Sequence, residues 1–533
     1  MDILNQIKIF KPRDLLETEV KEKLFLLLNN NDESIFYREN EEIHITASGF
    51  ILNPEMDQTL MVYHNIYQSL SWTGGHADGE KDLLSAAIRE AKEETGIEEV
   101  YPLSSEIVSL DILDVPPHQK NGKEVQPHQH ISVAYGLIAP MKQTLKVKPD
   151  ENSEVKWINL DDMQNKCEEE HMLVVYYKII DRMQDLKRKK EEQYTKLPKA
   201  FLGWYRENAR DLPWRKDKNP YHVWLSEIML QQTRVEAVKA YYIRFLKELP
   251  NIEQLSKVEE DKLLKLWEGL GYYNRVRNLQ KAARVIMDNY DGVFPTDYHQ
   301  ILSLPGIGEY TAGAIASICY EQAAPAVDGN VLRVISRIIE NYESIEKLVF
   351  KKQVSDRLKT VYPRGQCGDF TQSIMEIGAI VCLPNGTPKC VICPAESFCM
   401  AHKNNQEELL PVKKKKKARR IEEKTVFVLS CGDHIAIKQR MDESLLSGLW
   451  ELPNIPKVDM KEAIGIASQW GVSPIIIEKE IEKKHIFTHI EWRMTCYYLR
   501  CQTQTEEFTW VSKEQLEKEF ALPTAFRQFL NPV

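Results

Sequence analysis

Residues 304–312 have the sequence Leu-Pro-Gly-Ile-Gly-Glu-Tyr-Thr-Ala and lie between two stretches with helical apolar spacing. A Gly-x-Gly turn before a helix exposes backbone N–H groups at the helix N-terminus, an arrangement that binds phosphate. Gly306 and Gly308 are therefore candidate phosphate contacts. The turn alone is a weak signal, but Val-Asp-Gly-Asn-Val follows at residues 327–331. The acidic residue of that second segment could carry chemistry or could simply cap a helix.

The sequence around this turn is patterned in three blocks. Residues 197–380 have apolar residues at spacings of three and four, broken at Gly and Pro. Short runs typical of strands occur before this block, at 43–63 and 129–138, and after it, at 425–530. The pattern predicts a multidomain chain with an α+β domain, an all-α domain and a second α+β domain.

Length and composition limit the class of protein. At roughly 100–200 residues per domain, 533 residues suggest about three domains. Hydrophobic residues make up 43% and charged residues 28%, which excludes a largely disordered, collagen-like or coiled-coil chain. The sequence has no apolar run of 18 residues, and its N-terminus lacks a basic flank followed by an apolar core. We expect a cytoplasmic monomer with no membrane partner.

Charge is distributed unevenly along the chain. The net charge of −9 consists of −15 over residues 1–180 and +6 over residues 181–533. An acidic module that suits nucleotide handling is thus joined to a mildly basic part, for which phosphate contact remains possible.

Two composition shifts mark the expected domain boundaries. Residues 181–193 form a charged stretch that is expected to end the first domain as a solvated helix. Residues 403–424 are polar and basic, with five consecutive lysines, and predict a linker that is a solvated tether rather than a dedicated DNA clamp. The expected domains are residues 1–185, 190–402 and 425–533.

Four cysteines crowd into one short segment. Cys382, Cys390, Cys393 and Cys399 are separated by seven, two and five residues. Ten cysteines in the whole chain are too few for a disulfide scaffold, so in a reducing compartment this cluster indicates a metal site. The spacing alone favours zinc.

One glutamate stands in an otherwise apolar segment. Glu227 lies within Trp-Leu-Ser-Glu-Ile-Met-Leu at residues 224–230. It could be an exposed helix position, or an acid whose pKa is raised by burial so that it can protonate a base.

Taken together, these segments resemble the helix-hairpin-helix superfamily of DNA glycosylases. Trp214-Arg215 and the segment at 224–235 closely resemble the adenine glycosylases of the MutY type. The resemblance implies that Glu227 protonates adenine N7 and then activates or orients water, and that Asp328 stabilises the cationic sugar with support from Tyr310 and Asn330. Relatives that cut the DNA backbone have a lysine where Tyr310 stands, so simple hydrolysis of the N-glycosidic bond is expected.

The same resemblance implies a cofactor and DNA contacts. The four cysteines, in the loop 382–399, would hold a [4Fe–4S] cluster. Gln232 and Tyr272 match residues that wedge into the base stack while adenine is flipped out. The expected DNA-binding residues of this domain are Arg215, Gln232, Thr233, Leu270, Tyr272, Gly306 and Gly308.

Residues 425–533 resemble the C-terminal domain of these glycosylases, which is a Nudix-like fold without the Nudix box. Phe487-Thr488-His489 matches the family's Phe-Ser-His loop, which contacts 8-oxoguanine. Thr488 keeps the hydroxyl of the serine that it replaces. The implied partner is double-stranded DNA that contains an adenine:8-oxoguanine mismatch.

The first domain has a carboxylate-rich helix. Glu90, Glu93 and Glu94 share one helix face, an arrangement that is unfavourable unless a divalent cation such as Mg²⁺ or Mn²⁺ occupies it. With Gly75, Arg89, Gly96 and Ile97 in register, the segment resembles the Nudix box. By this resemblance the three glutamates and the Gly75 carbonyl would hold metal, and a nucleoside diphosphate derivative would be hydrolysed.

One position departs from the Nudix box, since Lys81 stands where a glutamate is required. Glu80 is adjacent and could take its place. If it does not, the first domain would be a nucleotide-sensing or docking module that has lost hydrolysis. A second alternative makes the whole chain a zinc-stabilised DNA-binding regulator without catalysis.

Overall fold

The computed structural model describes residues 3–30, 32–120, 123–414, 418–441 and 445–530. Contacts divide the chain into two compact units, and each is described by itself. The first unit contains Met1–Ala209, Val327–Pro363 and Gln372–Lys414, and the second contains Arg210–Ala326, Arg364–Thr371 and Lys415–Val533. Among the described residues, no helix is both long enough and apolar enough to cross a membrane.

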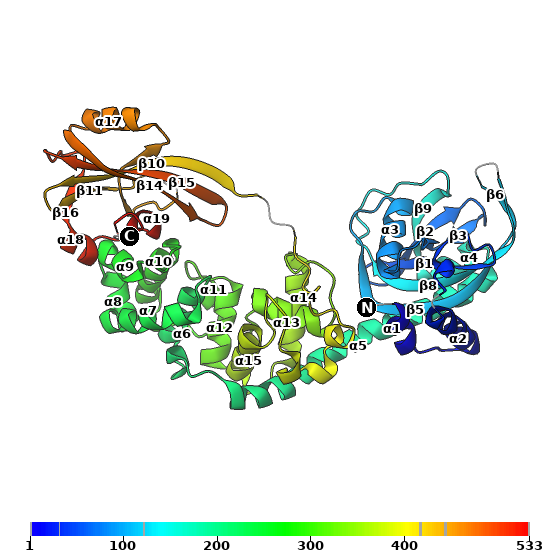
Figure 1. Ribbon diagram of the computed structural model, residues 1–533. Coiled ribbons are helices and arrows are strands. Elements are labelled where there is room, and N and C mark those ends of the chain that lie inside the picture. The colour runs from blue at the N-terminus through cyan, green and yellow to red at the C-terminus, as the bar shows by residue number, and fades with distance from the viewer. Residues whose placement is uncertain (1–2, 31, 121–122, 415–417, 442–444, 531–533) are drawn as a thin grey trace. The chain divides into compact units, whose positions relative to one another are not determined.

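The N-terminal domain is built on a seven-stranded mixed sheet (Figure 1). Its order is β3-β2-β1-β8-β5, with β4 paired to β1 and β9 paired to β2, and β1 runs parallel to β8. A separate hairpin, β6–β7, joins β5 to β8. The strands are β1 (Ile43–Leu52), β2 (Gln58–His64), β3 (Ser69–Ser71), β4 (Thr73–His76), β5 (Tyr101–Val115), β6 (His118–Lys120), β7 (Lys123–Val125), β8 (His128–Ile138) and β9 (Asn152–Asn159).

Helices cover both faces of this sheet. Ala47 and Val133 contribute to a core with α1 (Ile3–Ile9), α2 (Leu15–Asn29) and α3 (Leu83–Thr95). Phe50 and Ala134 contribute to a second core with α4 (Met163–Lys166) and α5 (Glu170–Asn208). The expected α+β fold is confirmed, and the expected carboxylate-rich helix is α3.

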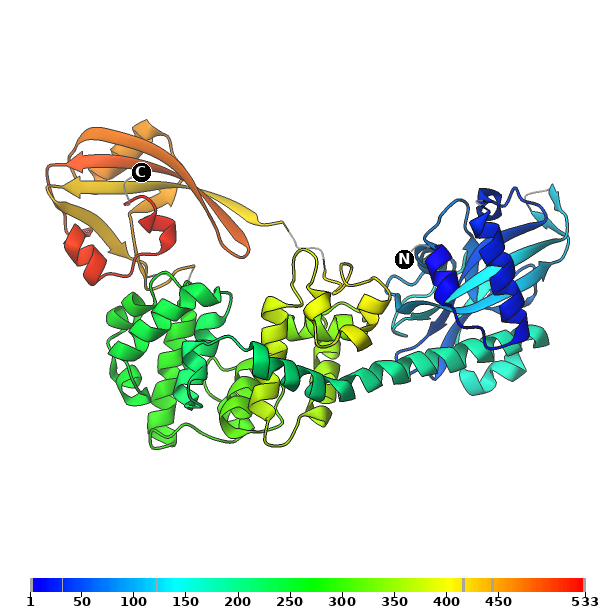
Figure 2. The same ribbon diagram turned by 60° about the horizontal axis from the view of Figure 1, so that its bottom comes forward.

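The long helix α5 corrects the first expected boundary. It spans 39 residues without a break and passes through the charged stretch 181–193 (Figure 2). That stretch is therefore not a solvated end, because Arg182, Met183 and Leu186 along it are buried. The helix is amphipathic, and its charged residues lie between the buried ones. The expected end of the first domain, at residue 185, and the expected start of the second, at residue 190, both lie inside α5.

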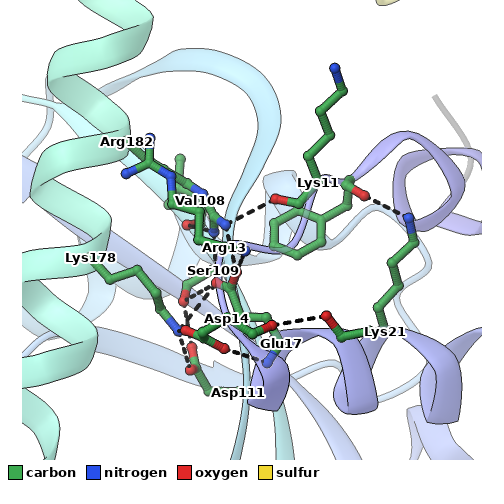
Figure 3. A network of polar contacts seen from close by, with 12 residues as sticks. Lys11, Arg13, Asp14, Glu17, Lys21, Val108, Ser109, Asp111, Lys178 and Arg182 are labelled. Atoms are coloured by element: carbon green, nitrogen blue, oxygen red, sulfur yellow. Dashed lines mark hydrogen bonds and ion pairs between the residues drawn. The ribbon is translucent and has the colours of Figure 1, made fainter.

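A polar network fixes the first part of α5 to the domain (Figure 3). Glu17 of α2 is fully buried and accepts hydrogen bonds from Arg182 at 2.7 and 2.5 Å. Arg182 also donates to the backbone carbonyls of Lys11 and Val108. Burial alone would raise the pKa of Glu17, but the hydrogen bonds and charge of Arg182 hold that pKa below its ordinary value.

The middle of the chain is helical, as expected. Gly and Pro mark the turns between short helices, and no strand is assigned from residue 160 to residue 414. The helices are α6 (Pro220–Leu230), α7 (Val235–Glu248), α8 (Ile252–Lys257), α9 (Glu260–Trp267), α10 (Asn274–Asn289), α11 (Tyr298–Leu302), α12 (Glu309–Tyr320), α13 (Gly329–Ile338), α14 (Leu348–Val361), α15 (Cys367–Ile380) and α16 (Met400–Lys403).

The C-terminal domain has a second seven-stranded sheet with the same kind of central pair, because β10 runs parallel to β15. Its order is β12-β11-β10-β15-β14, with β13 on β10 and β16 on β11. The elements are β10 (Arg420–Cys431), β11 (His434–Gln439), β12 (Trp450–Glu451), β13 (Asn454–Pro456), α17 (Met460–Gln469), β14 (Pro474–Ile486), β15 (Ile490–Cys501), β16 (Thr509–Ser512), α18 (Lys513–Lys518) and α19 (Thr524–Arg527).

The expected linker 403–424 is shorter than predicted at its C-terminal end. Strand β10 begins at Arg420 and pairs with β15 from there, so residues 420–424 belong to the sheet. The strand at Arg420–Lys424 was not recognised in the sequence because most of these residues are charged. Of the five consecutive lysines, residues 415–417 lie outside the described residues.

Candidate functional site

Glu227 and Tyr310 meet in the second unit. Asn219 caps the N-terminus of α6 by accepting from the Tyr221 N–H, and this helix carries Glu227 into the interior, where it is 6% exposed. Tyr310, in the first turn of α12, donates its hydroxyl hydrogen to Glu227 Oε2 at 2.8 Å. The structure thus brings together two of the expected catalytic residues. A buried carboxyl group held by a neutral donor is suited to proton transfer.

Two turns in this unit hold non-glycine residues in the left-handed region. Gln232, after α6, has φ 56°, and Tyr272, before α10, has φ 48°. Such conformations are strained for residues with side chains and persist where the surroundings enforce them. These are the two residues expected to wedge into DNA, and Tyr272 is 49% exposed. Thr233 lies beside Gln232, with its hydroxyl 3.3 Å from the Gln231 carbonyl.

Arg275 ties these two turns together. Its Nη1 donates to the carbonyls of Ile228 and Gln231 at 2.7 and 2.6 Å, and its Nη2 donates to those of Leu270 and Gly271 at 2.9 and 3.1 Å. Burial lowers the pKa of Arg275 to about 10. The Leu270 side chain is buried, so it supports this turn from within rather than facing a DNA surface.

A third turn lies at the tip of the β14–β15 hairpin. Phe487 packs against Trp492, with ring centroids 4.9 Å apart, while Thr488 and His489 are exposed. Thr488 Oγ1 lies 2.7 Å from the Tyr272 hydroxyl. The residues expected to recognise the opposite base therefore lie next to one of the expected wedge residues.

The Gly306 turn has the geometry expected of it. Gly306 has φ +75°, and a Cβ there would lie 2.5 Å from Asn278 Cβ, so only glycine fits. Gly308 is the N-cap of α12, so this turn stands at a helix N-terminus, the position that binds phosphate in such motifs. Arg215 ends a short 3₁₀ turn that precedes α6, with its Nη1 3.3 Å from the Arg210 carbonyl.

Asp328 and Asn330 belong to the first unit. Asp328 caps α13 and accepts from the N–H groups of Asn330 and Val331 at 2.9 and 2.8 Å. The Asn330 amide donates to the other Asp328 oxygen at 2.7 Å. Burial raises the pKa of Asp328, and these hydrogen bonds act in the opposite direction. This geometry is compatible with Asp328 as a helix cap and also with Asp328 as the residue that stabilises the sugar.

Arg333 joins this aspartate to the cysteine loop. It donates to Asn330 Oδ1 at 3.1 Å, to the Gly378 carbonyl at 2.6 Å and to the Cys382 carbonyl at 2.8 Å. The orientation of Asn330, and through it that of Asp328, thus depends on how the loop is folded.

The four cysteines line one pocket with mainly apolar walls. Arg337 donates to Cys382 Sγ at 3.1 Å, and burial raises the pKa of Cys393 and Cys399 to about 12. Buried thiols that converge in this way are suited to a metal that binds them as thiolates. The donor set fits a [4Fe–4S] cluster and also fits Zn²⁺.

The carboxylates of the N-terminal domain form a second candidate site. Oxygen atoms of Glu90, Glu94 and Glu151 lie within 4.8 Å of one another. Burial raises the pKa of Glu94 to about 8, although it accepts from the Gly74 N–H at 3.1 Å. A Cβ on Gly75 would lie 2.3 Å from Glu90 Cδ, so a larger residue here would displace the Glu90 carboxylate.

The positions of Glu93 and Glu80 differ from those that the Nudix box implies. Glu93 lies outside the group and is half exposed between Arg89 and Lys148, at 3.8 and 3.6 Å. Glu80 approaches Arg89 at 3.4 Å, whereas Lys81 pairs with Glu33 at the surface. Glu80, rather than Lys81, therefore lies beside the carboxylate-rich helix α3.

The sequence did not identify four residues of these sites, namely Arg275, Arg333, Arg337 and Glu151. The arginines bind mainly backbone carbonyls, which leave no residue pattern, and Glu151 lies far from the Nudix helix in sequence. Arg333 and Arg337 stand in the largely apolar segment 331–338, which is a signal for both, whereas Arg275 lies in a polar segment that gives none.

Comparison with known proteins defines the class. Residues 225–359 match the family described as HhH-GPD superfamily base excision DNA repair protein, and residues 42–179 and 425–532 each match a NUDIX domain. The chain therefore contains a base excision DNA repair domain of that superfamily, which lies in the sequence between two NUDIX domains.

The particular family follows from the relatives. The chain is 39% identical over 259 residues to the adenine DNA glycosylase of Buchnera aphidicola subsp. Baizongia pistaciae, covering 47% of this chain and 70% of that protein. It is 32% identical over 396 residues to the adenine DNA glycosylase of Homo sapiens, covering 62% and 72%. The chain belongs to the adenine DNA glycosylases.

Among solved structures, a thermostable thymine-DNA glycosylase is 30% identical, with a TM-score of 0.37, and covers 41% of this chain and 99% of its own.

Proposed function

We propose that this chain removes adenine from double-stranded DNA where the adenine lies opposite 8-oxoguanine or guanine. The observation that carries the proposal is the buried Glu227 carboxyl group, bound by the Tyr310 hydroxyl at 2.8 Å. Protonation of adenine N7 by Glu227 makes the base a better leaving group, and the carboxylate that remains can then orient a water molecule. Family membership supports both the substrate class and this assignment.

Asp328 is assigned to the sugar. As the glycosidic bond breaks, positive charge develops on the deoxyribose, and a fixed carboxylate stabilises it. Two backbone N–H groups and the Asn330 amide hold this carboxylate in one orientation. Tyr310 offers no amine that could form a Schiff base, so the reaction is simple hydrolysis without strand cleavage.

Recognition of the lesion is assigned to two neighbouring turns. Gln232 and Tyr272 occupy strained, surface positions that suit insertion into the base stack. Thr488 and His489 lie exposed at the hairpin tip and have hydrogen-bonding groups for the opposite base. The Tyr272–Thr488 contact supports a common surface for extrusion of adenine and recognition of its partner.

The cysteine pocket is assigned to a [4Fe–4S] cluster with a structural role. Cys382, Cys390, Cys393 and Cys399 would bind it, and the cluster would then stabilise the loop on which Arg333 depends. A brown protein with about four iron atoms per chain supports this assignment. A colourless protein with one zinc per chain would favour the zinc-stabilised alternative.

The excision assay tests the main proposal. Full-length protein in excess is incubated with duplexes that place adenine opposite 8-oxoguanine, guanine, cytosine or thymine. Free adenine should appear fastest from the 8-oxoguanine duplex and next from the guanine duplex, and strands should break only after alkali. Equal release from all four duplexes, or a covalent product trapped by borohydride, would contradict it.

A second activity is proposed for the N-terminal NUDIX domain: metal-dependent hydrolysis of a nucleoside diphosphate derivative. Glu90, Glu94 and Glu151 would bind Mg²⁺ or Mn²⁺, with the Gly75 carbonyl and Glu93 nearby. The supporting observation is that three buried or partly buried carboxylates converge and that Glu80 approaches Arg89.

The nucleotide assay separates this activity from docking. Full-length protein is screened against a panel of nucleoside di- and triphosphate derivatives with Mg²⁺, and Glu94→Gln serves as the inactive variant. Turnover that is lost in Glu94→Gln while adenine excision is retained supports hydrolysis. No turnover with any nucleotide would favour the sensing or docking alternative.

A further inference from the structure

Four histidine side chains gather at one place in the N-terminal domain. His44 lies at the start of β1, His76 at the end of β4, and His128 and His130 at the start of β8. His130 is opposite His44 in the parallel β1–β8 pair, and His76 is opposite Thr46 in the antiparallel β1–β4 pair. Residues two apart on a strand share a face, so all four imidazoles project from the same face of the sheet.

The rings are close enough to share one ion. Centroid separations are 4.8 Å for His44–His130, 4.9 Å for His44–His76 and 5.1 Å for His76–His130. One ring nitrogen from each of these three residues lies within 4.8 Å of the other two. His128 completes the group, because its Nε2 lies 3.1 Å from His130 Nε2.

Hydrogen bonds fix which nitrogen faces the centre. His44 Nδ1 lies 2.9 Å from the Asn40 carbonyl, which can only accept, so Nδ1 carries the hydrogen and Nε2 has a bare lone pair. His44 is 2% exposed, and its Nε2 has no hydrogen-bond partner among the described residues. A buried acceptor that is left unpaired is unfavourable, so this atom points to a ligand that it would bind.

His128 repeats this arrangement. Its Nδ1 lies 2.9 Å from the Gln126 carbonyl, which directs Nε2 toward His130. A backbone carbonyl behind the imidazole is the usual support of a histidine that binds a metal, because it fixes the tautomer and the ring orientation.

The histidine group is separate from the carboxylate site. Gly75 and Ala47 face α3, where Glu90 lies against the Gly75 Cα. The next residue of β4, His76, projects to the opposite face. The two groups therefore lie on opposite sides of one strand and are made of different donors.

We propose that His44, His76 and His130, with His128 as the fourth ligand, bind one Zn²⁺ ion. Neutral imidazoles without carboxylates select a borderline transition metal over Mg²⁺ or Ca²⁺. Zn–N distances of about 2.0–2.1 Å place tetrahedral ligands about 3.4 Å apart, so the three ring nitrogens, within 4.8 Å of one another, need to close by at most about 1.4 Å. The ion would join β1, β4 and β8 and would hold the start of the segment that carries Glu80.

Zinc analysis of the full-length protein tests the site. The protein is supplied with Zn²⁺, desalted and measured for metal content and for X-ray absorption at the zinc edge. One zinc per chain with a nitrogen shell at about 2.0 Å is expected, whereas zinc in the cysteine pocket would show sulfur at about 2.3 Å. No retained zinc, or zinc with a sulfur shell only, would overturn the proposal.

A paired variant identifies the ligands. His76→Gln with His130→Gln spares the buried His44, and His171→Gln, on α5 with a side chain 72% exposed, is the matched control. The double variant should lose at least tenfold in retained zinc and should no longer gain thermal stability from Zn²⁺, whereas the control should match the wild type. Equal zinc and equal stabilisation in the double variant would overturn the assignment.

Discussion

At the residue scale, the site depends on single carboxyl groups that are fixed by short hydrogen bonds. Glu227 accepts a hydrogen bond from the Tyr310 hydroxyl, whereas Asp328 accepts from two backbone N–H groups and from the Asn330 amide. The difference in surroundings suits different tasks, since a proton donor must change its charge and an electrostatic stabiliser must keep it.

Asp328→Asn isolates the charge of this residue. Asparagine caps helices about as well as aspartate, so the fold of α13 should be retained. The neutral amide cannot stabilise the sugar cation, and single-turnover adenine release should fall by at least about 10²-fold. A rate near that of the wild type, with normal thermal stability, would show that Asp328 is only a helix cap.

His489→Ala tests recognition of the opposite base. We expect the preference for 8-oxoguanine over guanine to fall, because an exposed hydrogen-bonding group at the hairpin tip is removed while the Glu227 site is untouched. Excision from the two duplexes is compared at subsaturating enzyme, with His434→Ala of β11 as the control. An unchanged preference would move recognition to Thr233 and the Leu270–Tyr272 turn.

At the element scale, the strained turns are held by one side chain of α10. Arg275→Lys keeps the positive charge but cannot donate to four carbonyls, so both turns should loosen. We expect the free energy of unfolding to fall by about 2 kcal/mol and adenine release from duplex DNA to slow. Arg284→Lys, on the same helix with a single carbonyl partner, should change neither quantity strongly. Equal effects of the two variants would argue against a clamp.

The α2–α5 network gives a stability that depends on pH. Glu17 has a pKa below its ordinary value of 4.5, so its contribution is complete above about that pH and is lost as pH falls through the lower folded-state pKa. Glu17→Gln should cost about 3 kcal/mol near neutrality, and its difference from wild type should shrink in acid. Hydrogen exchange of β5 measures this, with the exposed Glu19→Gln as control. A difference that does not depend on pH would contradict the assignment.

Helices and strands could be predicted from the sequence where one hydrophobic period, that of a strand or that of a helix, dominated the segment. Strands β1, β2 and β8 follow from alternating or apolar runs and helix α3 from apolar spacing, whereas β5 and β9 were not predicted. The continuity of α5 was missed because charges mask its buried side, and the start of β10 was missed for the same reason. The residues of the motifs were found by register, but Arg275 and Glu151 were not, because their partners are backbone carbonyls or lie on distant segments.

At the scale of the whole molecule, one helix joins the N-terminal NUDIX domain to the glycosylase. α5 begins in the N-terminal domain and ends beyond the expected boundary, and Arg357 of α14 pairs with its Glu191 at 2.8 Å. Ser104 and Ser105 of β5 donate to the buried Glu340, which follows α13. The N-terminal domain is therefore packed against the part of the glycosylase that contains the cysteine loop, and it is not simply tethered to it.

The central claim is that Glu227 is the proton donor for adenine release. Glu227→Gln keeps size and hydrogen bonding but removes the acidic proton, and Glu236→Gln, on α7 with a side chain 78% exposed, is the matched control. Single-turnover release of adenine from the adenine:8-oxoguanine duplex is measured together with duplex binding. We predict a loss of at least about 10²-fold in rate with binding retained for Glu227→Gln, and no loss for the control. Excision by Glu227→Gln at a rate near that of the wild type would contradict the account.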